Sequence, residues 1–458
     1  MRENQNVKKL TCKNLKAESD FNVNSNSSLN TLAIKQDHTA TINQNIPLKP
    51  KNVLETGLDH TFINDLILKN VMYLGEFSID QVADLIKLPL PIIYKCMEEL
   101  RREVFIEIKG SANLMRYSYR YMLTNSGRNR AGSLFEISRY SGPAPVTLSS
   151  YREIVNRQSI MHIRLTLAAL KKAFSKLIIE EHFLARIGAA VCSGRPIFLY
   201  GPPGNGKTSI AETVGSVIPG SVYIPYSIVV NGEIIVLYDP ATHNKLSSGD
   251  DENAGDLRWV RTHRPSVRAG GELTLKSLDL NFDPTSKYYT APLQMKANNG
   301  LLVVDDLGRQ QIDPQELLNR WIVPLEERKD LLTLNTGAKL EVPFDQLIIF
   351  ATNLDPKQLV DHAFLRRLRY KIRVSRPNFK SYEEIFKLIC ERYKISFNQE
   401  AFTFLTENYY KNLSLKYNAC EPRDFIEHIL DHAKFENKSP KLTKRSVSAA
   451  WEDYFVEE

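Results

Sequence analysis

A glycine-rich stretch near the middle of the chain places the strongest constraint on what this sequence can fold into. The apolar run 196–200 leads into Gly201-Pro202-Pro203-Gly204-Asn205-Gly206-Lys207-Thr208, whose spacing is G-x-x-x-x-G-K-[ST]. The run predicts a buried strand, and residues 209–214 predict a helix that opens directly after the glycine-rich turn. A strand, a phosphate-binding loop and a helix in this order indicate an α/β fold.

Each part of this loop suits a chain of phosphates. The glycines let the backbone approach a ligand closely, and the freed N–H groups form an anion nest at a helix N-terminus. Lys207 is expected to reach the β- and γ-phosphates, and Thr208 is expected to hold Mg²⁺. The candidate residues for binding ATP are therefore Gly201, Pro202, Pro203, Gly204, Asn205, Gly206, Lys207, Thr208 and Ser209.

The bulk composition excludes several classes of protein. The chain has 458 residues, which suggests two to four domains, and its net charge of +7 is weak evidence for a nucleic-acid partner. The five cysteines are scattered without a C-x-x-C pair, so neither a disulfide framework nor a zinc site is indicated, and a reducing cytoplasm fits. No apolar run approaches about 18 residues, so we expect no membrane insertion.

The N-terminal third divides into three segments. Residues 1–55 are rich in Asn, Ser, Lys and Thr, which predicts a disordered tail. Residues 56–140 predict three helices, the second opened by a capping box at Ser78 and Gln81, and then two alternating runs, 104–108 and 117–121. This order resembles a winged helix-turn-helix domain of bacterial regulators (α+β). Residues 141–155 contain Gly142-Pro143-Ala144-Pro145 and predict a linker.

Two partners are open for the winged-helix-like domain. DNA is favoured by a basic wing that suits phosphates and that contains Lys109, Arg116, Arg120, Arg128 and Arg130. A protein partner is favoured by the third helix, which lacks the donors that usually read base edges. The positions of that helix expected to face a groove are Pro91, Ile92, Tyr94, Lys95 and Glu98.

After the loop helix, the chain alternates between hairpins and buried strands. Asn231-Gly232 between apolar runs predicts one hairpin, residues 272–280 with 287–293 predict a second, and the runs around Thr336-Gly337 predict a third. Residues 240–270 are polar and predict irregular structure. From about Phe379 we expect four helical segments, the third opening at Glu421.

Two further apolar runs end in polar side chains. Residues 301–304 are followed by Asp305 and Asp306, and residues 347–352 are followed by Asn353. The carboxyl ends of parallel strands form the edge at which open α/β sheets bind ligands. We expect Asp305 to hold Mg²⁺, Asp306 to polarise the attacking water, and Asn353 to orient that water.

Taken together, residues 150–458 resemble an AAA+ ATPase: a P-loop parallel sheet over residues 156–378 and a helical lid over 379–458. The resemblance implies that Asp305 and Asp306 form the Walker B motif and that Asn353 is sensor 1. It also implies that Arg366 or Arg367 is a finger toward a neighbouring subunit and that Arg423 is sensor 2. Such proteins bind ATP with Mg²⁺ in a ring, usually a hexamer, and remodel a macromolecular client.

The hairpin insertions are similar to those of the MoxR-like, helix-2-insert branch. Residues 318–326 and 363–367 resemble a bacterial group of predicted ATPases with chaperone activity that is associated with Flp pilus assembly. One departure is Asp306, because the family usually carries Glu there. The shorter carboxylate leaves a slow scaffold gated by ATP open beside a chaperone-like ATPase. The winged-helix resemblance and the basic wing leave open a third function, a DNA-bound ATP-dependent regulator.

Overall fold

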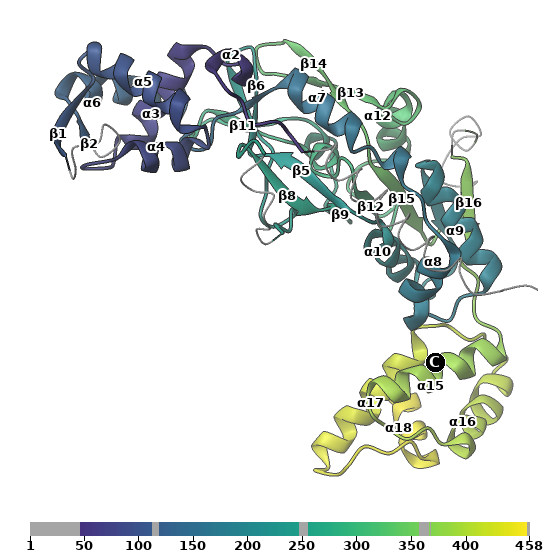
Figure 1. The fold of residues 1–458 in the computed structure, drawn as a ribbon. Coiled ribbons are helices and arrows are strands. Elements are labelled where there is room, and N and C mark those ends of the chain that lie inside the picture. Colours follow the sequence, from purple (N-terminus) through teal and green to yellow (C-terminus); the bar gives the residue numbers. More distant parts are fainter. Residues whose placement is uncertain (1–45, 112–118, 247–254, 357–365, 367, 456–458) are drawn as a thin grey trace, which may run out of the picture. The chain divides into compact units, whose positions relative to one another are not determined.

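The computed structural model describes residues 46–111, 119–246, 255–356, 366 and 368–455. The predicted tail therefore lies outside the described residues, apart from 46–55. Within the described part, residues 60–123 have the expected order of three helices and an antiparallel ribbon (Figure 1). The capping box of the second helix is confirmed. The elements of residues 53–137 are α2 (Val53–Thr56), α3 (His60–Val71), α4 (Ile79–Ile86), α5 (Leu90–Arg102), β1 (Ile106–Ser111), β2 (Tyr119–Leu123) and α6 (Asn125–Ile137).

The central element of the fold is a five-stranded parallel sheet in the order β16-β4-β15-β12-β9. This confirms the α/β fold class. Along β4, Phe198 packs into the core on one face while Ile197 and Leu199 pack on the other, since successive side chains of a strand point to opposite faces. The strands are β4 (Ile197–Tyr200), β9 (Ser266–Ala269), β12 (Leu301–Val304), β15 (Leu347–Thr352) and β16 (Tyr370–Arg373).

Helices cover both faces of this sheet, as a parallel sheet requires. Side chains of α8 (Leu167–Ala173), α9 (Glu181–Ser193) and α10 (Lys207–Val217) share one apolar cluster with β4 and β15. Trp321 of α12 (Pro314–Glu327) is fully buried against the other face, where its ring contacts Phe350. The three inner strands β4, β15 and β12 are therefore enclosed, and the side chains that follow them gather at the carboxyl edge of the sheet.

A second, mixed sheet has the order β10-β11-β7-β6-β3. The predicted hairpin at Asn231 is confirmed: Asn231 and Gly232 have φ of +51° and +82° between antiparallel strands. The hairpin around Thr336 is confirmed as well. The strands of the second sheet are β3 (Val146–Thr147), β6 (Ser227–Val230), β7 (Glu233–Val236), β10 (Asn281–Asp283) and β11 (Tyr288–Thr290). The hairpin around Thr336 is a separate pair of strands, β13 (Lys329–Thr333) and β14 (Lys339–Pro343).

Two sequence predictions in this region are wrong. The first arm of the second hairpin is a 3-10 turn over Leu275–Leu278, because Thr274 and Ser277 form a capping box, and the strand follows at β10. Residues 240–270 are not irregular throughout: β8 (Trp259–His263) pairs with β5 (Ser221–Pro225), and β9 is a strand of the central sheet. Val267 and Ala269 are buried, which explains why this polar stretch is extended.

The remaining elements include α7 (Leu148–Arg157), which begins inside the predicted linker and extends beyond it, and α11 (Leu293–Lys296). The C-terminal part confirms the expected four helical segments, with the third opening at Glu421 (Figure 1). They are α15 (Phe379–Arg392), α16 (Gln399–Leu405) with a π-helical continuation over Thr406–Lys411, α17 (Glu421–Phe435) and α18 (Lys444–Tyr454). Among the described residues, no helix is long and apolar enough to cross a membrane.

Candidate functional site

The glycine-rich loop connects the end of β4 to the first turn of α10. Gly201, Gly204 and Gly206 have φ of +145°, +73° and +81°, in the region that glycine enters without steric cost. A Cβ at Gly201 would lie 2.1 Å from the carbonyl oxygen of Val374, whereas a Cβ at Gly206 would meet nothing within 4 Å. Gly201 is therefore required by packing against the end of β16, and Gly206 borders open space.

Gly201→Ala should destabilise the folded chain far more than Gly206→Ala. The first change adds a clash with backbone to the strain of a positive φ, which together cost about 3 kcal/mol or more. The second change adds strain alone, about 1–2 kcal/mol. Urea unfolding without nucleotide measures both, and equal losses for the two variants would contradict this reading of the loop.

Lys207 lies at the start of α10 and is buried. Its ammonium donates to the carbonyl oxygens of Gly201 at 2.9 Å and Pro202 at 2.8 Å, so it lies folded back across the loop. Burial lowers the pKa of Lys207, while the charges of Asp306 and Asp305 act in the opposite direction. A charge held by two neutral carbonyls in a partly desolvated place is suited to an anionic ligand.

Asp305 and Thr208 supply the oxygen ligands expected for a magnesium ion. The hydroxyl of Thr208 donates to Oδ2 of Asp305 at 2.9 Å, so the end of β12 and the first turn of α10 meet. A hydroxyl and a carboxylate are hard oxygen donors of the kind Mg²⁺ prefers. The residue types and their proximity therefore fit the ion that the sequence predicts here.

Asp306 lies one residue beyond Asp305 and has φ of +50°. Asp is among the residues that enter this region most readily, apart from glycine. The following turn is fastened to β15, because Leu307 donates its N–H to Ala351 at 2.8 Å and Thr352 donates its hydroxyl to Leu307 at 2.7 Å. Nδ2 of Asn353 then donates to Oδ1 of Asp306 at 3.3 Å. The sheet thus brings together the acid and the amide that the sequence assigns to one water.

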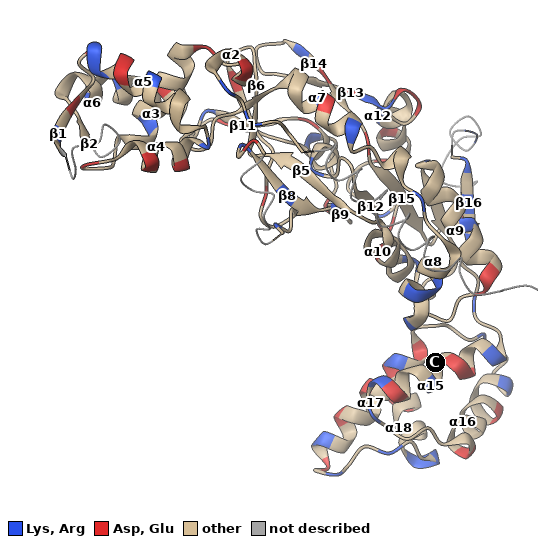
Figure 2. Ribbon diagram, in the orientation of Figure 1, with Lys and Arg blue, Asp and Glu red and all other residues tan. Residues whose placement is uncertain are grey.

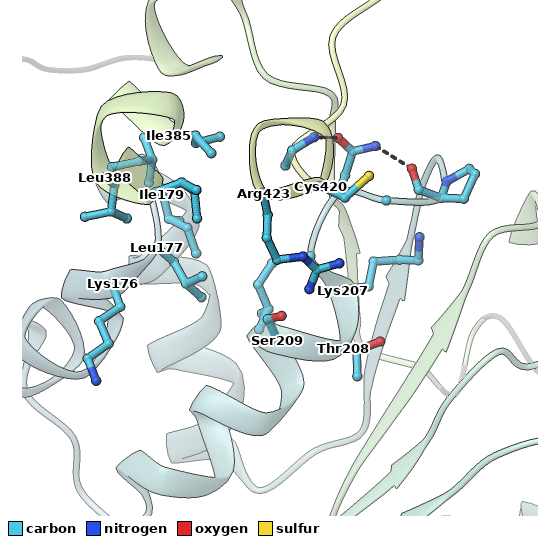
Figure 3. Close-up of a pocket in the computed structure, with 18 of the residues that line it drawn as sticks. Lys176, Leu177, Ile179, Lys207, Thr208, Ser209, Ile385, Leu388, Cys420 and Arg423 are labelled. Atoms are coloured by element: carbon cyan, nitrogen blue, oxygen red, sulfur yellow. Dashed lines mark hydrogen bonds between the residues drawn. The ribbon is translucent and has the colours of Figure 1, made fainter. Parts of the chain in front are cut away.

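Lys207, Thr208, Asp305, Asp306 and Asn353 line one cavity of about 450 Å³ together with residues 203–206 of the loop and Ser209. Gly201 and Pro202 line a neighbouring cavity. Figure 3 shows apolar side chains, among them Leu177, Ile179, Ile385 and Leu388, on one side, and Lys207 and Thr208 on the other. The apolar wall comes from the segment before α9 and from α15, far apart in the sequence. A cavity with an apolar wall and a polar, cationic floor matches the two ends of a nucleotide.

The C-terminal helices contact the loop directly. The N–H of Cys420 donates to the carbonyl oxygen of Gly204 at 2.8 Å, and the N–H of Ala419 donates to Oδ1 of the buried Asn205 at 3.1 Å. Arg423, one turn further along α17, lines the same cavity (Figure 3) and pairs with Asp424 at 3.1 Å. The start of α17 is therefore held against the phosphate loop, and Arg423 faces the ligand space.

The two finger candidates are placed differently. Arg366 is exposed and lines a second cavity of about 720 Å³ together with Lys371 and Arg373, and Asn353 borders both cavities. Arg366 is absent from the described lining of the nucleotide cavity in its own chain. Arg367 lies outside the described residues.

The basic side chains expected on the wing are partly neutralised in the described residues. Arg128 and Arg130 lie on α6 and not on the ribbon of β1 and β2, so their expected place on the wing is wrong. Arg130 forms a two-oxygen pair with Asp65, and Arg120 pairs with Glu76 at 3.5 Å. Arg116 lies outside the described residues. Ile92 was expected to face a groove, but it is 2% exposed and packs in the domain core, so that expectation is wrong. Figure 2 shows Lys and Arg interspersed with Asp and Glu on the helices of residues 53–137.

Several residues in or beside the cavity were missed in the sequence. Arg268 of β9, which donates to Asp305, was missed because residues 240–270 were expected to be irregular. The alternation Ser266-Val267-Arg268-Ala269, with its second and fourth side chains buried, is the signal that predicts this strand. The apolar wall and the contacts of Ala419 and Cys420 carry no motif, because they arise only when distant segments pack together.

Comparisons with known proteins give limited likenesses. A family model described as a domain of unknown function (DUF8689) matches residues 378–453. No curated protein matches the chain. NtrX from Brucella abortus, solved in complex with ADP, is 14% identical with a TM-score of 0.37, and the match covers 70% of this chain and 65% of NtrX. A mutant of RuvB from Thermotoga maritima is 13% identical with a TM-score of 0.35, over 65% of this chain and 72% of RuvB. The chain thus spans less than two thirds of the length of NtrX.

Proposed function

We propose that this chain is an AAA+ ATPase that binds ATP with Mg²⁺ and hydrolyses it. The observation that carries the proposal is that one cavity is lined by residues 203–206 of the phosphate loop, Lys207, Thr208, the two acids that follow β12, and Asn353. These residues come from three strands and a helix that the parallel sheet aligns. If the glycine-rich turn had no role in binding, there would be no reason for Asp305, Asp306 and Asn353 to lie in the same cavity as the loop.

Each side chain has a role that follows from its position. Lys207 would leave the carbonyl oxygens of Gly201 and Pro202 and donate to the β- and γ-phosphates. Asp306, aimed by its hydrogen bond from Asn353, would accept a proton from the attacking water. Thr208 and Asp305 would hold Mg²⁺, which when bound neutralises charge on the phosphates. Arg423 would report the γ-phosphate to the C-terminal helices.

The apolar wall favours a nucleoside triphosphate over inorganic pyrophosphate as the substrate. A purine ring would bury the apolar surface of Leu177, Ile179 and Ile385, which is favourable, whereas a chain of phosphates without a base would leave that surface exposed to water. The base would lie beside α15, so the C-terminal helices would contact both ends of the ligand. We further propose that the energy of hydrolysis moves these helices and thereby remodels a macromolecular client.

Hydrolysis per chain should increase with protein concentration. Arg366 lines a neighbouring cavity, so we propose that it completes the site of a second copy in a ring. A finger of this kind is worth about 10³ to 10⁵ in rate in other phosphoryl-transfer systems. The measurement is phosphate release with Mg²⁺ and ATP over a range of protein concentrations, beside particle mass. Arg366→Ala should bind ATP but lose turnover, with the exposed Arg445→Ala on α18 as the matched control.

Mixing separates action on a neighbour from action within one chain. An excess of Lys207→Ala chains, which retain Arg366, should restore part of the turnover of Arg366→Ala chains. A rate per chain that is independent of concentration, with no restoration in the mixture, would contradict a site shared between copies. Absence of phosphate release at every concentration of the unaltered chain would contradict the proposed activity itself.

A further inference from the structure

Arg268 of β9 forms a bridge that the roles assigned so far do not use. Its Nη2 donates to Oδ2 of Asp305 at 2.8 Å, and its Nη1 donates to Oε1 of Glu212 at 3.2 Å. Glu212 lies on α10, one turn beyond Thr208. The guanidinium therefore links the strand that carries the acid to the helix that begins at the phosphate loop.

This bridge occupies the same oxygen that the metal site needs. Oδ2 of Asp305 already accepts from Thr208, so it has two donors, and Oδ1 accepts from the N–H of Asp306 at 3.0 Å. The side chain of Asp305 is 7% exposed, whereas those of Arg268 and Glu212 are 54% and 58% exposed. The carboxylate is thus enclosed, and a half-exposed guanidinium lies against it.

We propose that Arg268 is a positioning residue that neutralises Asp305 until Mg²⁺ enters with the nucleotide. This inference rests on the proposed function. A guanidinium on Asp305 repels a divalent cation that uses the same oxygen, so the ion enters only as the guanidinium withdraws. When the guanidinium leaves Asp305, it keeps Glu212 as its partner, because Nη1 of Arg268 already pairs with Glu212.

The position of β9 makes this exchange local. Arg268 is in register with Val303 of β12, so the backbone that carries it is fixed by the parallel pairing of the two strands. Only the guanidinium has to move, from its bridge between Asp305 and Glu212 onto Glu212 alone. The affinity for magnesium is therefore set in part by how strongly the two carboxylates compete for this guanidinium.

Two substitutions should shift magnesium binding in opposite directions. Arg268→Gln removes the competing charge, so the MgCl₂ midpoint for binding of a fluorescent ADP analogue should fall at least threefold. Glu212→Gln removes the partner that receives the guanidinium, so the midpoint should rise at least threefold. The readout is nucleotide fluorescence during a MgCl₂ titration of the full chain, and no turnover is required.

Two controls separate this role from simple packing. Arg268→Lys keeps the positive charge on Asp305 and should leave the midpoint within twofold of the unaltered chain. Arg157→Gln breaks an exposed pair with Glu153 on α7 and should leave it unchanged. Thermal unfolding of each variant identifies any that fails to fold, and the remaining member of the pair still carries the prediction.

The outcomes distinguish the two proposals. If the unaltered chain binds no nucleotide at any MgCl₂ concentration, the proposed function is wrong. If it binds nucleotide, but Arg268→Gln and Glu212→Gln shift the midpoint in the same direction or leave it unmoved, the role of Arg268 is wrong and the proposed function stands.

Discussion

Replacing Lys207 with alanine should reduce the affinity for ATP about 100-fold, which corresponds to about 2.7 kcal/mol. A hydrogen bond to a charged group contributes about 1.5–3 kcal/mol, and the lysine would make more than one to the phosphates. The substitution also frees the carbonyl oxygens of Gly201 and Pro202, both at the edge of the loop. The measurement is isothermal titration of the variant with ATP and MgCl₂.

The control for this experiment is Lys434→Ala. Lys434 is an exposed lysine in the last turn of α17, away from the phosphate loop, so its removal should leave the affinity unchanged. Unfolding curves should show that Lys207→Ala is folded, because the charge it removes is itself held in a partly desolvated place. Unchanged ATP affinity in folded Lys207→Ala would contradict the assignment of the loop.

Asp306→Asn should leave ATP affinity within about threefold and reduce turnover at least 100-fold. Removing a general base typically costs a factor of about 10² to 10⁴. Asparagine has nearly the shape of aspartate and also tolerates the positive φ of +50° at this position, so the backbone should not move. The measurement pairs phosphate release with nucleotide titration of the same preparation.

Asp306→Glu tests the effect of the shorter carboxylate at this position. Glutamate lacks the local hydrogen bonds that let aspartate enter the left-handed region, so the longer reach comes with backbone strain. The exposed Asp431→Asn serves as the control for both changes. Turnover of Asp306→Asn equal to that of the unaltered chain would remove Asp306 from the reaction and favour a nucleotide-gated scaffold.

The sequence predicts those parts of the fold whose causes are local. The strand before the loop, the acid-tipped strand and β15 are continuous apolar runs, and a buried parallel strand needs no other signal. The hairpin at Asn231 follows from turn chemistry, and the four C-terminal segments follow from helical periodicity and caps. The order of the strands in the sheet is set by long-range packing and was not predicted.

The candidate site divides in the same way. Lys207, Thr208, Asp305, Asp306 and Asn353 are recognised by their spacing and by the strands that precede them, and the structure brings them to one cavity. Arg268 was missed because β9 is only four residues long and half polar, so its weak alternation was outweighed by the polar stretch around it. The apolar wall is invisible because aliphatic side chains have the same appearance whether they cover a core or a ligand.

The most direct test of a nucleotide clamped between the loop and the two acids is a crystal structure with Mg²⁺ and a non-hydrolysable ATP analogue. We predict phosphates along residues 204–208, Nζ of Lys207 moved from the carbonyl oxygens of Gly201 and Pro202 onto the phosphates, and the ion at Thr208 and Asp305. A loop without phosphates, with Lys207 still on both carbonyl oxygens at saturating analogue, would contradict the account.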